Sequence, residues 1–157
     1  MTAAPSLDIR TRHLCNFSID FDEVQYIATD AGLRINYIVK EGVVTGDRFA
    51  GEFVAGGGDW IVLGSDGVAR LDVRATILAD DGSLVFLTNS GRVDLRDTAL
   101  RDRMAAGEAL AWSDLYARSA PLFETSSEKY GWLNSIVTVA LNGFAPQHVD
   151  YAVYEVC

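Results

Sequence analysis

The chain has 157 residues and a formal net charge of −9, from 22 acidic and 13 basic side chains. This length fits a single domain, expected over residues 1–157. The negative charge repels polyanions, so nucleic acid is not an expected partner. No apolar run approaches the roughly 18 residues of a membrane-spanning helix, and residues 1–8 lack the features of a secretory signal. We therefore expect no membrane partner and a cytoplasmic protein.

Cysteine and histidine are too sparse for a metal centre. Cys15 and Cys157 stand near opposite ends of the chain, and His13 and His148 are equally far apart. Two cysteines cannot form a disulfide framework, and none of these four residues has a neighbour at the spacing of a zinc site. The sequence also has no dinucleotide fingerprint, phosphate loop, HExxH or GxSxG motif. Any catalysis is therefore expected to proceed without a cofactor or metal.

Segments with the two-residue hydrophobic alternation of β-strands follow one another along most of the chain. These strands are expected at residues 13–21, 34–39, 48–54, 60–63, 68–78, 83–88, 136–141 and 149–156. Tight turns at Asp66-Gly67 and Asp81-Gly82 would join three of them into an antiparallel meander. One helix is expected at residues 97–107, capped by Asp97 and stopped by Gly107. This order favours an all-β barrel or closed sandwich.

The strand at residues 68–78 separates two kinds of side chain. Leu71 and Val73 would lie on its apolar face, and Asp72 and Arg74 on its charged face. In one interpretation the charged face is solvated and the two charges form an exposed ion pair. In the other, Asp72 and Arg74 line the polar interior of a barrel, as a base and an oxyanion-stabilising cation or as a structural pair. The alternation alone does not choose between them.

Two further segments combine glycine or aromatic residues with polar groups. Three glycines precede Asp59 and Trp60, and glycine permits close approach of a backbone to a ligand or another strand. Further along, Tyr130, Trp132 and Asn134 alternate, so they would share one face of a strand. Aromatic walls with a few polar tips are typical of a small-molecule pocket. A glycine turn and an ordinary aromatic core are the alternatives.

Several short motifs occur in an order that resembles the DUF3237 family, also called the UPF0311 proteins. They are Gly46-Asp-Arg-Phe-Ala-Gly51, Gly57-Gly58-Asp59-Trp60, Asp66-Gly67, Leu71-Asp-Val-Arg74, Asp80-Asp-Gly82, Phe123-Glu-Thr125 and Tyr130-Gly-Trp-Leu-Asn134. Each motif is weak alone, but seven in sequence, covering residues 14–155, are specific. The resemblance implies a closed antiparallel up-and-down β-barrel, here with one short helix, and it implies little about activity.

An eight-stranded barrel has room for side chains or one small ligand in its lumen. The resemblance therefore favours the inward orientation of the motif residues. The candidate catalytic residues are Asp72, Arg74, Tyr130 and Asp59. The candidate substrate-binding residues are Trp60, Tyr37, Glu124, Trp132 and Asn134.

The leading hypothesis is a cofactor-independent isomerase, lyase or cyclase that acts on a small organic molecule in the lumen. Asp72 or Asp59 would move a proton, and Arg74 with Tyr130 would stabilise a developing oxyanion. One alternative is a non-catalytic barrel that binds a small ligand, and another is a structural barrel with a filled lumen. An apolar outer strand face would also favour a homo-oligomer.

Overall fold

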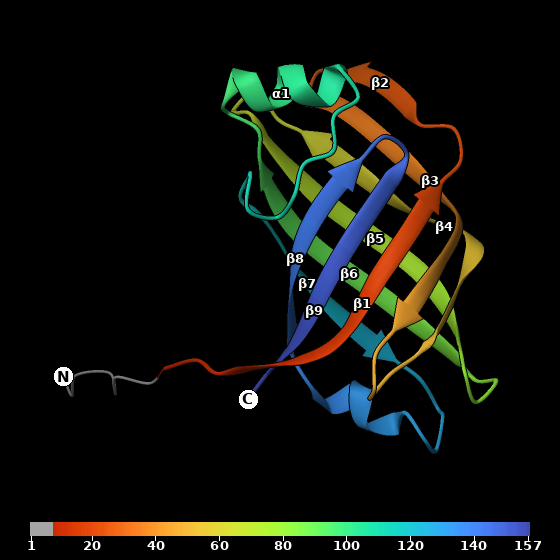
Figure 1. Ribbon diagram of the computed structural model, residues 1–157. Helices are drawn as coiled ribbons and strands as arrows, with labels where there is room; N and C mark the ends of the chain where they lie inside the picture. The colour runs from red at the N-terminus through yellow and green to blue at the C-terminus, as the bar shows by residue number, and fades with distance from the viewer. Residues whose placement is uncertain (1–7) are drawn as a thin grey trace.

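The computed structural model describes residues 8–157, which form nine β-strands, one α-helix and one 3-10 helix (Figure 1). In chain order these are β1 (Thr11–Phe21), β2 (Gln25–Thr29), β3 (Gly32–Thr45), β4 (Gly51–Leu63), β5 (Val68–Ala79), β6 (Leu84–Asp94), α1 (Thr98–Ala105), β7 (Ala117–Glu124), η1 (Gly131–Ser135), β8 (Thr138–Ala145) and β9 (His148–Val156). None of the helices in this part of the chain has the length and hydropathy to span a bilayer.

The sheet closes on itself. The strands are hydrogen-bonded in the order β1-β9-β8-β7-β6-β5-β4-β3-β2, and β1 also pairs with β3. All these pairings are antiparallel, so β1 and β3–β9 form a closed eight-stranded barrel, with β2 attached to β3 alone. The expectation of a closed antiparallel barrel with one short helix is confirmed. A closed barrel leaves its eight strands without free edges.

Three details of the predicted elements are wrong. Residues 48–54 and 60–63 belong largely to one long strand, β4, and the glycine run lies inside it. Residues 130–134 do not form a strand, because η1 turns there, so Tyr130, Trp132 and Asn134 do not share a strand face. Two strands, β2 and β7, were not predicted, and Pro121 inside β7 is a residue that usually interrupts strand patterns.

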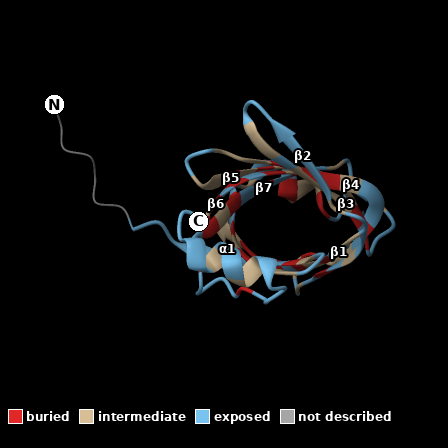
Figure 2. Ribbon diagram, turned by 90° about the horizontal axis from the view of Figure 1, so that it is seen from above, coloured by how far each residue is buried: buried red, intermediate tan, exposed pale blue. Residues whose placement is uncertain are grey.

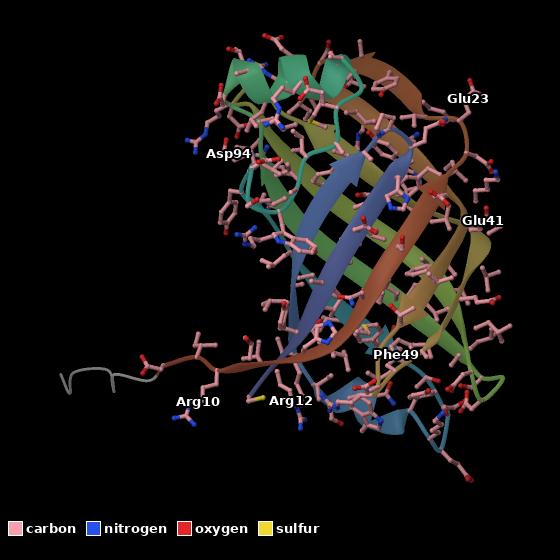
Figure 3. The ribbon with its side chains drawn as sticks, in the orientation of Figure 1. Arg10, Arg12, Glu23, Glu41, Phe49 and Asp94 are labelled. Carbon is pink, nitrogen blue, oxygen red and sulfur yellow. The ribbon has the colours of Figure 1, made fainter. Side chains whose placement is uncertain are left out.

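The two ends of the barrel differ, and we name them by the helix that each carries (Figure 1). At the η1 end, a buried cluster fills the barrel, with Phe17, Phe49 and Leu133 among its members. At the α1 end, a second cluster forms around Ile61, Leu71, Val93 and Leu95, with α1 packed against it through Leu100 and Met104. Asp94 and Phe49 lie near these opposite ends in Figure 3. Viewed along the barrel, buried residues, shown in red, are interspersed around the ring of strands (Figure 2).

The β5 strand shows which way its alternating side chains point. Leu71 and Val73 are buried and face the core. The side chains of Asp72 and Arg74 are 49% and 55% exposed, and they form an ion pair with each other at 3.0 Å. The inward orientation of these two charges was therefore wrong. The barrel follows the usual rule that the apolar face of a strand turns to the core and its charged face to solvent.

Candidate functional site

A cavity opens among the buried residues at the α1 end of the barrel. It measures about 80 Å³ as the space in which the centre of a water molecule can lie, enough for several water molecules. The wall comes from seven strands and α1, and most of it is apolar, with Ile35, Ile61, Leu71, Val93, Met104 and Phe144 among its residues. No lysine or arginine lines this cavity in the described part of the chain.

Asp59 is the carboxylic acid in this apolar wall. It is 6% exposed, and its Oδ1 accepts a hydrogen bond from the backbone N–H of Asp72 at 2.9 Å. Burial raises the pKa of Asp59 to about 7, although the hydrogen bond from Asp72 acts in the opposite direction. The carboxyl group is therefore divided between its protonated and ionised forms near neutral pH. A group in this state can both give and take a proton.

The glycine run places Asp59 in the wall. Three β4 residues, 55–57, lie opposite the single β5 residue Ala75, so the chain bulges just before Asp59. Gly56 has a φ of +99°, a conformation that other residues rarely adopt. At Gly58 a Cβ would lie 2.6 Å from the carbonyl oxygen of Tyr37. Glycine at this position therefore lets β3 and β4 approach each other closely beside the cavity.

Two phenols share the cavity with Asp59. Tyr37 is its cross-strand partner on β3, and Tyr151 enters from β9. Burial raises the pKa of Tyr37 to about 12, with further contributions from Tyr26 and Asp59. Burial also raises the pKa of Tyr151, and Asp59 adds to this effect. Both hydroxyls remain protonated at physiological pH and can donate hydrogen bonds.

A chain of buried polar groups continues around the barrel from Tyr151. Asn142 on β8 is the cross-strand partner of Tyr151 and is fully buried. Its Oδ1 accepts a hydrogen bond from Ser119 Oγ at 3.2 Å, whereas its Nδ2 has no partner. On β6, the buried Oδ1 of Asn89 is also unpaired. Unpaired buried polar atoms are costly, and ordered water often satisfies them.

His148 forms part of the cavity wall, but its imidazole is bonded to carboxylates. Nδ1 lies 2.6 Å from Asp20 Oδ1, and Nε2 lies 3.1 Å from Asp150 Oδ1. Partial burial lowers the pKa of His148, but these two carboxylates raise it above the ordinary value overall. A carboxylate beside each nitrogen favours the protonated form of the imidazole. The ring therefore links Asp20 on β1 to Asp150 on β9.

The structure brings together only two of the nine candidate residues, Asp59 and Tyr37, in the cavity wall. Asp72 and Arg74 lie on the outside of the barrel as described above. Trp60 lines an outer hollow with Arg74, and Glu124 is exposed at the end of β7.

The remaining three candidates lie at the η1 end. Tyr130 is 2% exposed within the aromatic core, and its hydroxyl donates to Asp80 at 2.5 Å. The Arg48 guanidinium lies over the Trp132 ring, 4.6 Å from the ring centroid. Asn134 is exposed and bonds both the backbone N–H and the carbonyl of Thr125, each at 2.8 Å. These residues close the end of the barrel.

Three of the buried polar residues, Tyr151, Ser119 and Asn142, were not among those predicted from the sequence. Tyr151 alternates with Val149 and Val153 on a predicted strand, so its inward orientation could have been read from the sequence. Asn142 lies one residue beyond the end expected for its strand. Ser119 lies in β7, which was not predicted.

Comparisons with known proteins agree with this fold. The family "Protein of unknown function (DUF3237)" matches residues 9–156. The chain belongs to the DUF3237 family. It is 30% identical over 143 residues to a UPF0311 protein of Clostridium acetobutylicum, covering 90% of each chain.

Two further relatives bear on structure and activity. A crystal structure of a conserved protein of unknown function from Rhodopseudomonas palustris has a TM-score of 0.88 and 22% identity. The similarity covers 98% of this chain and 100% of that one. The chain is also 29% identical over 111 residues to the hydroalkoxylation enzyme phnH of Penicillium herquei, covering 71% of this chain and 58% of that protein.

Proposed function

We propose that the protein is a cofactor-independent enzyme that transfers protons to and from a small organic molecule in the barrel cavity. The observation that carries this proposal is Asp59, a buried carboxyl group with a pKa of about 7 in an otherwise apolar cavity. A general acid–base group is most effective when its pKa lies near the working pH. Strongly shifted pKa values in a cavity are also typical of functional sites.

The cavity supports an uncharged and largely apolar substrate. An anionic substrate would be buried near Asp59 without a lysine or arginine in the wall, and the wall histidine, His148, already lies between Asp20 and Asp150, so the cost in desolvation would be high. A neutral substrate with one or two hydroxyl or carbonyl groups could instead receive hydrogen bonds from Tyr37 and Tyr151. The apolar wall would bind the rest of the molecule.

The relation to the hydroalkoxylation enzyme phnH supports one specific reaction, the addition of an O–H group across a carbon–carbon double bond. In this reaction the protonated carboxyl of Asp59 gives its proton to one carbon of an electron-rich alkene. The hydroxyl oxygen of the substrate then bonds to the other carbon. The hydroxyl proton goes to the Asp59 carboxylate, which restores the acid, so no external reagent is consumed. Within one molecule the product is a cyclic ether.

A non-catalytic ligand-binding barrel is the second candidate. The enclosed apolar wall supports it, since such a cavity would bind an apolar molecule whether or not Asp59 reacts. The two candidates differ in what Asp59 does. Binding without chemistry requires no proton transfer, so replacing the carboxyl would leave a binding barrel working.

The test is turnover of a panel of alkenyl phenols and alkenyl alcohols in D₂O, with cyclic ether formation followed by mass spectrometry. Wild-type protein should form the ether with deuterium on the carbon that is protonated. Asp59→Asn keeps the shape and the acceptor for Asp72 N–H but loses the proton, and we expect a loss of about 10²–10⁴-fold. Asp72→Asn, an outward carboxylate, is the matched control and should keep wild-type turnover. Equal turnover by wild-type and Asp59→Asn protein would refute the assignment.

A further inference from the structure

The outer face of the barrel carries a row of three arginines on neighbouring strands. Arg70 on β5, Arg92 on β6 and Arg118 on β7 are successive partners in the strand register. Like charges directly opposite each other on neighbouring strands destabilise a sheet. A row of three in a chain with net charge −9 therefore needs an explanation.

The carboxylates near this row already have partners. Asp66 holds Arg70 with two hydrogen bonds, at 2.7 and 3.1 Å. Asp94, two residues beyond Arg92 on β6, bonds Arg96 through both of its oxygens.

The third nearby acid, Asp72, lies across from Ser90 and is paired with Arg74 at 3.0 Å. Among residues 8–157, Arg92 and Arg118 therefore form hydrogen bonds to backbone carbonyls but not to any carboxylate.

Both free guanidinium groups are held in place by their own strands. Arg92 Nη1 donates to the carbonyl of Gly91 at 2.7 Å, and Arg118 Nη1 donates to the carbonyl of Ala117 at 2.8 Å. Arg118 also lies over the ring of Tyr116, 5.1 Å from its centroid. Each guanidinium has five N–H donors, so most of them remain available. Because the side chains are fixed, less conformational entropy is lost when a ligand binds.

A shallow hollow lies between the two arginines. It is lined by Ser90, Arg92, Tyr116, Arg118 and Ala120, with about 230 Å³ of space for the centre of a water molecule. Its polar groups are guanidinium N–H donors together with the hydroxyls of serine and tyrosine. Such groups match the oxygens of phosphate and carboxylate, which arginine binds with two parallel hydrogen bonds.

We propose that Arg92 and Arg118, with Ser90 and Tyr116, form an oxyanion-binding site on the outside of the β6–β7 wall. Its ligand is a phosphate or carboxylate group carried by a small molecule. A bound anion would neutralise the facing arginines. The site is independent of the chemistry proposed for the cavity, because Arg92 and Arg118 point outward whereas Asp59 points inward.

The test is titration with inorganic phosphate and, separately, with succinate at constant ionic strength in sodium chloride, followed by calorimetry and by thermal unfolding. Saturable binding to wild-type protein is expected, with a rise in melting temperature. Arg92→Gln and Arg118→Gln should each weaken it about tenfold. Arg34→Gln removes an exposed arginine elsewhere and is the matched control, with affinity unchanged. The anion that binds with the higher affinity would show whether the ligand carries a phosphate or a carboxylate group.

Two results would overturn the site. One is binding that does not saturate or that chloride reproduces, and the other is an equal loss of affinity in Arg34→Gln. A second measurement separates binding from folding. In chloride alone, Arg92→Gln and Arg118→Gln should melt at or above the wild-type temperature, since each removes a like-charge contact. A large drop in both variants would instead make the arginines structural. Asp59→Asn should bind phosphate as the wild type does.

Discussion

The carboxylate of Asp59 accepts a hydrogen bond from the backbone N–H of Asp72 at 2.9 Å, although the two side chains lie on opposite sides of the barrel wall. The β4–β5 pairing passes from Asp59 to Val62, so the ladder skips Trp60 and Ile61. The Asp59 side chain takes up the N–H that this gap leaves free. Two acids from neighbouring motifs thus have different roles. Asp59 is buried beside the cavity, and Asp72 supplies its backbone to position that carboxyl.

Asp59→Asn should stabilise the protein at neutral and alkaline pH. The folded-state pKa of about 7 exceeds the ordinary value of about 4, so the folded state binds more protons between these limits. Stability therefore falls as pH rises from about 4 to about 7, and above that the full cost of burying the charge remains. This difference of three pKa units lowers the free energy of unfolding by at most about 4 kcal/mol. Chemical denaturation at pH 5 and pH 8 measures this difference.

Wild-type protein is the control for Asp59→Asn, because the two proteins share every other titrating group. Wild type and Asp59→Asn should be close in stability near pH 4 and diverge above it, with the variant more stable. A variant that is equally destabilised at both pH values would mean that Asp59 is ionised and structurally paired in the fold.

Asp72→Asn and Arg74→Gln should each have little effect. Their side chains are about half exposed, and exposed ion pairs contribute about 1 kcal/mol or less. Both variants keep the backbone N–H that Asp59 uses. We expect turnover within about twofold of wild type and an unfolding free energy within about 1 kcal/mol. A large loss of turnover in either variant would contradict the outward placement of this pair.

Tyr130→Phe should weaken the closed end of the barrel without affecting the cavity. The hydroxyl donates to Asp80 at 2.5 Å, and the Lys129 ammonium lies 2.7 Å from the same oxygen. A hydrogen bond to a charged group is stronger than one between neutral groups, so we expect a measurable loss of stability, which the exposure of Asp80 limits. Urea unfolding measures the loss. A large loss of turnover in a variant that is still folded under the assay conditions would instead give Tyr130 a catalytic role.

His148→Gln should remove a pH-dependent link between β1 and β9. The carboxylates of Asp20 and Asp150 raise the folded-state pKa of His148 above its unfolded value. Its stabilising effect is therefore complete below the unfolded pKa, about 6.5, and is lost as pH rises through the folded value. Besides these two acids, Ser18 Oγ lies 3.4 Å from Nε2, and Glu41 is the cross-strand partner of Asp20. Thermal unfolding at pH 5.5 and 8.5 should show a larger deficit for the variant at the lower pH. A larger deficit at pH 8.5 than at pH 5.5 would contradict this link between His148 and the two carboxylates.

Self-association stays a prediction, and the outer face supplies a way to test it. Val54, Leu78, Phe86 and Leu122 are each at least 40% exposed on the outer faces of β4–β7. Exposed apolar surface of this kind favours contact with another chain. Sedimentation should show a wild-type oligomer that Phe86→Glu shifts to monomer, while Ile9→Glu, an exposed residue outside these strands, should not. A monomeric wild-type protein would refute the expectation.

The alternation of apolar and polar residues was enough to place most strands, but it does not say which side of a strand faces the core. For β5 the apolar side faced inward, as packing requires, and the family resemblance had favoured the opposite. The Tyr130–Asn134 segment alternates as a strand would, yet η1 forms there because it closes the barrel end. Such closure depends on tertiary contacts, which local patterns do not contain.

Asp59 could be found from the sequence because the glycine run marks a bulge, and a bulge re-aims the side chain beside it. Tyr37 was included because the family resemblance favoured an inward orientation of the candidate residues. Ser119 and Asn142 could not be recognised as partners. They lie on different strands, and their meeting depends on the register between β7 and β8. The cavity likewise depends on tertiary structure, since seven strands and α1 contribute to its wall.

The measurement that tests the central claim most directly is the pKa of the Asp59 carboxyl group. A ¹³C NMR titration of side-chain carboxyl carbons can supply it, with Asp59→Asn identifying the resonance. A pKa of about 7 would agree with a buried acid that exchanges protons at neutral pH. A value of about 4, the ordinary value for aspartate, would contradict the role proposed for it.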